Sequence, residues 1–165
     1  MLKFIATGLF VPAARMAHAD STKQSSEEVY ALAAMQAGGF PDFILMNKRN
    51  GQLHIIKDGA IFLTTPAISG KTKGDVIRGD GTSTPAGIFS LTPRDNDILF
   101  KQSGYDFYLI HGTSDARQVR LGSRDTNGRR ISAGCINVPD ILLPLIREIV
   151  QPKQGKPAYL VVLPD

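Results

Sequence analysis

The chain has 165 residues, of which 42% are hydrophobic and 21% charged, and its formal net charge is +4. This length suits one domain of ordinary size, and the composition excludes a globally disordered chain. The basic residues are mostly scattered, with no basic helix, zinc-finger spacing or aromatic-rich RNA-binding motif, so nucleic-acid binding is disfavoured.

The first 19 residues are typical of an export signal. Lys3 gives a positive start, residues 4–11 are apolar except for one threonine, and Ala17 and Ala19 fit a small-x-small cleavage site. The apolar run is too short for a stable membrane anchor, which needs about 20 residues. We therefore expect a signal peptide over residues 1–19 and a periplasmic or secreted mature protein. The alternative is an N-terminal amphipathic or disordered segment.

Residues 20–42 are expected to form a leader that contains one short helix. Ser25 or Ser26 can cap this helix, and the pair Gly38-Gly39 ends it soon after Gln36. The leader therefore precedes a single domain of ordinary length, which we expect over residues 43–165.

Short apolar segments separated by turn signals predict that this domain is mainly β. Asn50-Gly51 and Asp58-Gly59 are turn signals that would join the first three strands into a meander. The expected strands cover residues 43–47, 52–57, 60–68, 88–92, 108–111 and 158–163.

One helix is expected late in the domain. Pro139 and Asp140 open it, and apolar residues recur at helical spacing as far as Ile149. Residues 112–130 are polar and rich in turn formers, which predicts a loop. The fold class is therefore mainly β, with one or two helices in the whole chain.

Cys135 is the only cysteine, so no disulfide can form within the monomer. Gly134 precedes it in a run of small and apolar residues, and a glycine there permits the sharp turn that presents a nucleophile. All three histidines come earlier in the chain. This order excludes papain-like hydrolases, in which the cysteine comes first.

His111 is the candidate partner of this cysteine, because it ends an apolar strand and is followed by a loop. An imidazole beside the thiol would take its proton, and the thiolate would then attack a carbonyl. The amide groups of Gly134 and Cys135 could stabilise the resulting oxyanion. Taken singly, a free cysteine is more often a buried apolar residue, and a strand-end histidine more often structural. His54 alternates with Leu53 and Ile55, so we expect it to face solvent.

Several stretches of the sequence together resemble the L,D-transpeptidase (YkuD) family. They are Pro66-Ala-Ile-Ser-Gly-Lys71, Thr84-Pro85-Ala-Gly87-Ile-Phe89, Tyr108-Leu-Ile-His-Gly-Thr113, Leu121-Gly122 and Ile131-Ser-Ala-Gly-Cys-Ile-Asn-Val138. They occur in the family's order and the resemblance spans residues 43–163. The combined pattern is specific, whereas a Ser-x-Gly-Cys element alone would not be.

The resemblance implies a β-sandwich-like domain that transfers acyl groups of peptidoglycan stem peptides without a metal or cofactor. Cys135 would be the nucleophile and His111 its base, and the backbone carbonyl of Gly112 would orient the imidazole. The resemblance also implies residues that shape the nucleophile turn, the oxyanion site or the substrate contacts. These are Ser132, Gly134, Asn137 and Tyr108.

The sequence departs from the family pattern at two positions. Ala133 stands where many members have histidine, and Asn137 stands where arginine is frequent. Since asparagine cannot pair ionically with a carboxylate, substrate anchoring would fall to an arginine of a local cluster. The cluster consists of Arg117, Arg120, Arg124, Arg129 and Arg130. Residues 123–130 lengthen the spacing between the histidine and the cysteine, and would form either a flap beside the site or a solvated loop.

The acceptor remains open in the sequence. A second stem peptide, an outer-membrane lipoprotein and a free D-amino acid are all compatible with it. The alternatives to a transpeptidase are an L,D-carboxypeptidase, a D-amino-acid exchange enzyme, a wall-targeting toxin and a non-catalytic cell-wall-binding module. Each would place the protein at the cell wall.

Overall fold

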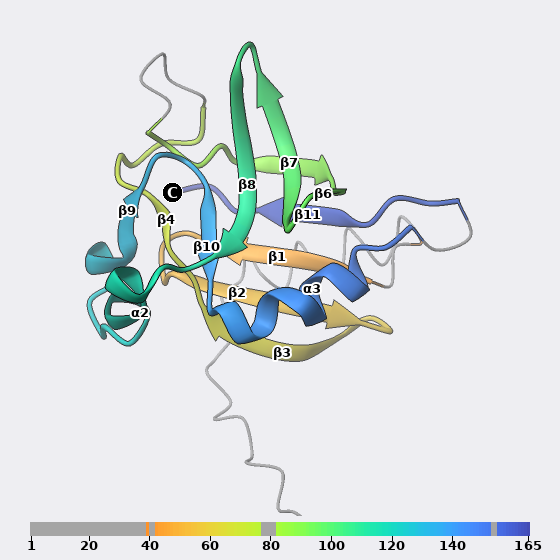
Figure 1. Cartoon of the computed structure of the whole chain (residues 1–165), viewed down its shortest axis with the longest axis horizontal. Coiled ribbons are helices and arrows are strands. Elements are labelled where there is room, and N and C mark those ends of the chain that lie inside the picture. The colour runs from red at the N-terminus through yellow and green to blue at the C-terminus, as the bar shows by residue number, and fades with distance from the viewer. Residues whose placement is uncertain (1–38, 40–41, 77–81, 153–154) are drawn as a thin grey trace, which may run out of the picture.

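The computed structural model describes residues 39, 42–76, 82–152 and 155–165 (Figure 1). The signal peptide and the leader helix lie outside these residues and stay predictions. In the described part of the chain, no helix is long and apolar enough to cross a membrane.

A five-stranded sheet forms one layer, in the order β3-β2-β1-β11-β5. Its strands are β1 (Phe43–Asn47), β2 (Gln52–Lys57), β3 (Ala60–Pro66), β5 (Gly87–Ser90) and β11 (Tyr159–Val162). The first three form the predicted antiparallel meander. The turn residues Gly51 and Gly59 have φ values of 61° and 74°, in the left-handed region that glycine adopts readily. β11 pairs parallel to β1 and antiparallel to β5.

A four-stranded sheet, in the order β10-β8-β7-β6, forms the second layer. Its strands are β6 (Thr92–Arg94), β7 (Asp97–Ser103), β8 (Asp106–Gly112) and β10 (Ile136–Val138). The short strands β4 (Ser69–Gly70) and β9 (Arg130–Ser132) form a separate parallel pair. The helices are α2 (Asp115–Leu121) and α3 (Leu143–Ile149), with 3-10 turns η1 (Asn127–Arg129) and η2 (Asp140–Leu142).

The main core joins the two sheets, which pack as a sandwich. It takes Ile44 and Met46 from β1, Ile98 and Phe100 from β7 and Ile110 from β8, together with residues of β10, β11 and α3. A smaller cluster, which includes Phe43 and Leu45, covers the opposite face of β1. The predicted mainly β sandwich is confirmed.

Because β1 and β2 are buried on both faces, alternation along β2 does not separate inside from outside. His54 is 4% exposed, and its Nδ1 lies 2.8 Å from the Thr64 hydroxyl. The prediction that His54 faces solvent is therefore wrong.

Candidate active site

His111 lies on β8, and Cys135 lies in the turn directly before the neighbouring strand β10. β10 pairs parallel to β8, and Asn137 is the register partner of His111. Cys135 lies two residues before Asn137, so strand alternation places its side chain on the same face. Its Sγ lies 3.7 Å from the carbonyl oxygen of Phe107, also on β8. Figure 1 shows these strands side by side.

Hydroxyl groups hold the carbonyls of the nucleophile turn. The Ser132 hydroxyl donates to the Cys135 carbonyl at 2.5 Å, and the Thr84 hydroxyl donates to the Gly134 carbonyl at 2.9 Å. Gly134 has a φ of 94°, in the region that disfavours other residues. Among the residues that the structure describes, the amides of Gly134 and Cys135 have no hydrogen-bond acceptor. They are therefore available to an oxyanion, as expected from the sequence.

The upstream sequence elements that contain Gly70 and Thr84 are hydrogen-bonded to each other and, through Thr84, to this turn. The Gly70 amide donates to the Thr84 hydroxyl at 2.8 Å, which directs that hydroxyl's own proton towards Gly134. A Cβ on Gly70 would lie 2.5 Å from the Thr82 carbonyl oxygen and 2.6 Å from the Thr84 nitrogen. Because both are backbone atoms, the contact excludes any larger residue. These elements therefore support the nucleophile turn from behind.

The imidazole of His111 is held at both ring nitrogens. Its Nδ1 lies 2.8 Å from the Gly112 carbonyl oxygen, and its Nε2 lies 2.9 Å from Nδ2 of Asn137. The Gly112 contact has the geometry that the resemblance implies. Within the described residues, no hydrogen bond joins the imidazole to the thiol.

Two predicted substrate contacts are wrong. Tyr108 is 2% exposed and packs in the core near Phe100, because it alternates with His111 and points to the opposite face of β8. Asn137 is fully buried, and its amide is bonded to His111 and Arg117. Neither side chain is accessible to a substrate.

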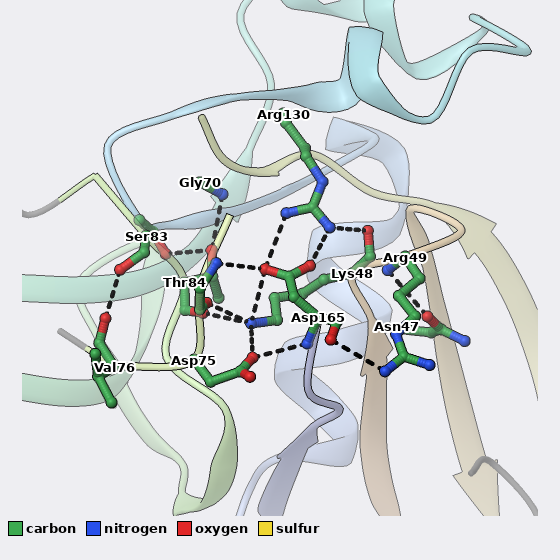
Figure 2. A network of polar contacts seen from close by, with 12 residues as sticks. Asn47, Lys48, Arg49, Gly70, Asp75, Val76, Ser83, Thr84, Arg130 and Asp165 are labelled. Carbon is green, nitrogen blue, oxygen red and sulfur yellow. Dashed lines mark hydrogen bonds and ion pairs between the residues drawn. The ribbon is translucent and has the colours of Figure 1, made fainter. Parts of the chain in front are cut away.

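The arginine cluster is largely structural. Arg129 donates to the Gly51 carbonyl at 2.6 Å and to the Ser123 carbonyl at 3.1 Å, which fastens residues 123–130 to the β1–β2 turn. Arg130 binds the carboxylate of Asp165 and donates to the Lys48 carbonyl at 3.0 Å (Figure 2). The segment is thus tied to the fold at both positions, and the flap expected as one alternative is not observed.

The thiol of Cys135 is half-buried. Burial raises its pKa, and the charge of Asp97 acts in the same direction, against a backbone hydrogen bond at Leu109 and the charge of Arg117, which lower it. Free cysteine, with a pKa of about 8.5, is already mostly protonated at neutral pH. Burial therefore favours the neutral thiol over the thiolate in the resting site.

We expect the alkylation rate of Cys135 by iodoacetamide to rise with pH through a pKa above that of free cysteine. The reason is that only the thiolate reacts, and burial disfavours it. Intact-mass measurement gives the rate directly, because the chain has a single cysteine. The same chain in denaturant serves as the control. A rate that reaches its plateau at or below neutral pH would instead indicate a preformed ion pair.

In the part of the chain that the structure describes, no cluster of three or more His, Cys, Asp or Glu side chains could hold a metal ion. The polar groups near Cys135 are the ones described above, and they are suited to proton transfer and to binding an oxyanion.

Comparison with known proteins agrees with this arrangement. Residues 41–143 match the YkuD model, the L,D-transpeptidase catalytic domain. The Ldtfm-avibactam carbamoyl enzyme is 24% identical, with 76% of this chain and 49% of that chain covered and a TM-score of 0.53. The catalytic domain of the Enterococcus faecium L,D-transpeptidase is 24% identical, with 74% and 96% covered and a TM-score of 0.53. An L,D-transpeptidase from Mycobacterium smegmatis is 14% identical, with 74% and 58% covered and a TM-score of 0.52.

These structural similarities show a shared fold, and the chain spans about half the length of the first of these structures. No curated protein matches the chain significantly. The family match covers residues 41–143, which is more than half of the chain. The chain therefore belongs to the YkuD family of L,D-transpeptidase catalytic domains.

Proposed function

We propose that the protein is a peptidoglycan L,D-transpeptidase in which Cys135 is the nucleophile and His111 its base. One observation carries the proposal. In a chain of this family, the register of β10 on β8 brings the Gly134–Cys135 turn beside the His111 imidazole. A non-catalytic wall-binding module would have no use for this arrangement.

In the proposed reaction, His111 Nε2 takes the thiol proton and the thiolate attacks the stem-peptide carbonyl that precedes a terminal D-residue. The amides of Gly134 and Cys135 donate to the oxyanion that forms. Collapse of this intermediate breaks the amide bond. The departing amine takes the proton from His111 and leaves a thioester on Cys135. Attack by an amine acceptor then releases the new amide and restores the thiol.

The resting contacts must change before this step. Nε2 of His111 accepts a hydrogen bond from Asn137, and the thiol bonds to the Phe107 carbonyl. The thiol must release this carbonyl and donate its hydrogen bond to Nε2 in place of the Asn137 amide. This exchange lets a half-buried thiol lose its proton to His111 as it attacks the carbonyl.

The substrate class also supports a location. Peptidoglycan lies outside the cytoplasmic membrane, so a transpeptidase of this kind works in the periplasm or at the cell surface. This agrees with the export signal expected over residues 1–19. One relative was captured as a carbamoyl enzyme with avibactam. We propose that Cys135 reacts with the same electrophile.

The test is incubation of the protein with a disaccharide tetrapeptide, followed by liquid chromatography and mass spectrometry. We expect release of the terminal D-amino acid together with cross-linked dimers. Release without dimers would replace the transpeptidase by a carboxypeptidase, and incorporation of an added D-amino acid without dimers would replace it by an exchange enzyme.

A parallel incubation with avibactam tests whether the thiol is activated at all. We expect a stable mass increase on the unmodified chain and none on the Cys135→Ala variant. Absence of both turnover and adduct, with Cys135 shown to be reduced, would contradict an enzymatic function and favour a wall-binding module.

A further inference from the structure

Two hydrogen bonds in series connect helix α2 to the imidazole of His111, and a third joins the imidazole to Gly112. Arg117 Nη1 lies 2.7 Å from Oδ1 of Asn137. Nδ2 of Asn137 lies 2.9 Å from Nε2 of His111, and Nδ1 of His111 lies 2.8 Å from the Gly112 carbonyl oxygen. Arg117 is half-buried on α2, whereas Asn137 on β10 is completely buried. We refer to this series as the Arg117 relay.

The chemistry of the groups fixes the direction of every bond in the relay. A guanidinium has donors only, so the atom of Asn137 that faces Arg117 must be its carbonyl oxygen. The amide nitrogen then faces His111 and donates, which makes Nε2 the acceptor. A backbone carbonyl accepts only, so Nδ1 carries the ring proton. The lone pair of the neutral imidazole is therefore on Nε2.

We propose that Arg117 is a positioning residue that fixes the tautomer of His111 through Asn137. The inference rests on the proposed function, because the tautomer matters only if His111 acts as a base. The lone pair on Nε2 is on the ring nitrogen that the thiol must reach, since Nδ1 is committed to Gly112.

Asparagine alone would not fix the tautomer. Without Arg117, the amide of Asn137 can turn over, so that its oxygen faces Nε2 and competes with the Gly112 carbonyl for the one ring proton. Whenever the proton is on Nε2, the ring presents a donor to the thiol and cannot accept its proton. The positive charge of Arg117 also favours the thiolate of Cys135, which gives the same residue a second effect in the same direction.

The tautomer is measured by long-range ¹H–¹⁵N correlation of histidine side chains in the ¹⁵N-labelled full chain. His111→Gln assigns the signals. We expect the neutral ring of the wild type to carry its proton on Nδ1. In Arg117→Met the two tautomers should mix, whereas Arg117→Lys should largely keep the wild-type form, because an ammonium also only donates. Arg120→Met, an exposed change on the same helix, is the matched control.

Asn137→Asp changes the amide into a carboxylate of almost the same size, and it is expected to reverse the position of the His111 ring proton. The carboxylate still accepts from Arg117 but cannot donate to Nε2, so we expect Nε2 of His111 to carry a proton in this variant. Should this buried substitution prevent folding, the Arg117 variants still decide the question.

Turnover of the tetrapeptide provides the second readout. We expect Arg117→Met to lower kcat by about tenfold to a hundredfold, the range seen when an outer partner of a functional histidine is lost, with KM nearly unchanged. An unchanged tautomer in Arg117→Met would overturn the proposal, and so would a change confined to KM. The NMR result does not depend on turnover. A shifted tautomer in a protein without transpeptidase activity would sink the proposed function and leave the relay in place.

Discussion

Replacing Cys135 with serine is expected to abolish release of the terminal D-amino acid, with turnover falling by roughly 10³-fold or more. A hydroxyl is far less acidic than a thiol, so transfer of its proton to the imidazole of His111 is much less favourable. The structure of the nucleophile turn should persist, because its hydrogen bonds come from Ser132 and Thr84.

Acid quenching of the reaction and intact-mass measurement will show whether a thioester forms on the wild type alone. Thermal unfolding of Cys135→Ser should stay within about 1 kcal/mol of the wild type, since the thiol is half-buried and its Phe107 contact is a weak hydrogen bond. Cys135→Ala should behave in the same way and serves as the control for size. Residual turnover of more than a tenth in both variants would remove Cys135 from the mechanism.

Strands with clear turn signals could be predicted to the residue, and a strand whose apolar pattern is interrupted could not. β1 and β2 have the predicted bounds, because the turns that contain Asn50-Gly51 and Asp58-Gly59 separate the first three strands. β7 was missed. Its register shifts between Leu99 and Lys101, so the alternation of apolar and polar residues breaks in its middle. Its outer half belongs to a hairpin that projects beyond the sheet, as Figure 1 shows, and has little apolar surface to bury.

Helix α2 was expected to be a loop for a similar reason. Its one buried residue is Leu121, whereas Val119 is 79% exposed, so no apolar stripe marks the helix in the sequence. Missing the helix also hid Arg117, which reaches Asn137 only from that position. The cluster of arginines was visible, but its distribution between Asn137, Gly51 and Asp165 depends on contacts that spacing does not report.

The pairing of His111 with Cys135 was predictable only as a motif. Their proximity depends on parallel pairing between β8 and β10, which are separated by α2, and sequence periodicity does not determine such pairing. The same register explains why Asn137 binds the histidine, because register partners in a parallel pair point to the same face. The resemblance had indicated a substrate contact for Asn137, and the buried register position accounts for the different outcome.

Replacing Lys48 with methionine is expected to destabilise the fold by about 1–3 kcal/mol, the cost of leaving buried acceptors without their donor, since the Asp75 carboxylate is 42% exposed and can be rehydrated. The Lys48 side chain is 1% exposed, and its Nζ lies 2.8 Å from a carboxylate oxygen of Asp75 and 3.5 Å from one of Asp165. It also donates to the Gly74 carbonyl at 2.8 Å and to the Thr84 carbonyl at 2.9 Å (Figure 2). Methionine fills the space but leaves these acceptors without their donor.

The effect should extend to the nucleophile turn. Thr84 accepts from Lys48 through its carbonyl and holds the Gly134 carbonyl through its hydroxyl. Loosening of Thr84 should therefore also slow acylation of Cys135. Lys101→Met, an exposed change on β7, is the matched control and should alter unfolding by less than about 0.5 kcal/mol. Chemical denaturation of both variants measures the difference.

The free energy of unfolding measured at acidic pH distinguishes loss of this ion pair from loss of packing. Burial alone would raise the pKa of Asp75, but hydrogen bonds from Lys48 and the Asp165 amide hold it below its usual value. Asp165 behaves alike, since bonds from Arg130 and Gly74 and the charge of Lys48 outweigh its burial. A carboxylate with a lowered folded-state pKa stabilises the protein above its unfolded pKa, and this stabilisation is lost as pH falls through the folded value.

In Lys48→Met both carboxylates lose part of what lowers their pKa, so they should take up protons at higher pH than in the wild type. The variant should therefore lose less stability than the wild type on acidification, and the difference in unfolding free energy between the two proteins should shrink as pH falls through the folded-state pKa values. If the two proteins differed by the same free energy at every pH, the cost would come from packing and not from charge. Lys48 would then support the nucleophile turn only as a buried side chain, and its contacts with Asp75 and Asp165 would be energetically neutral.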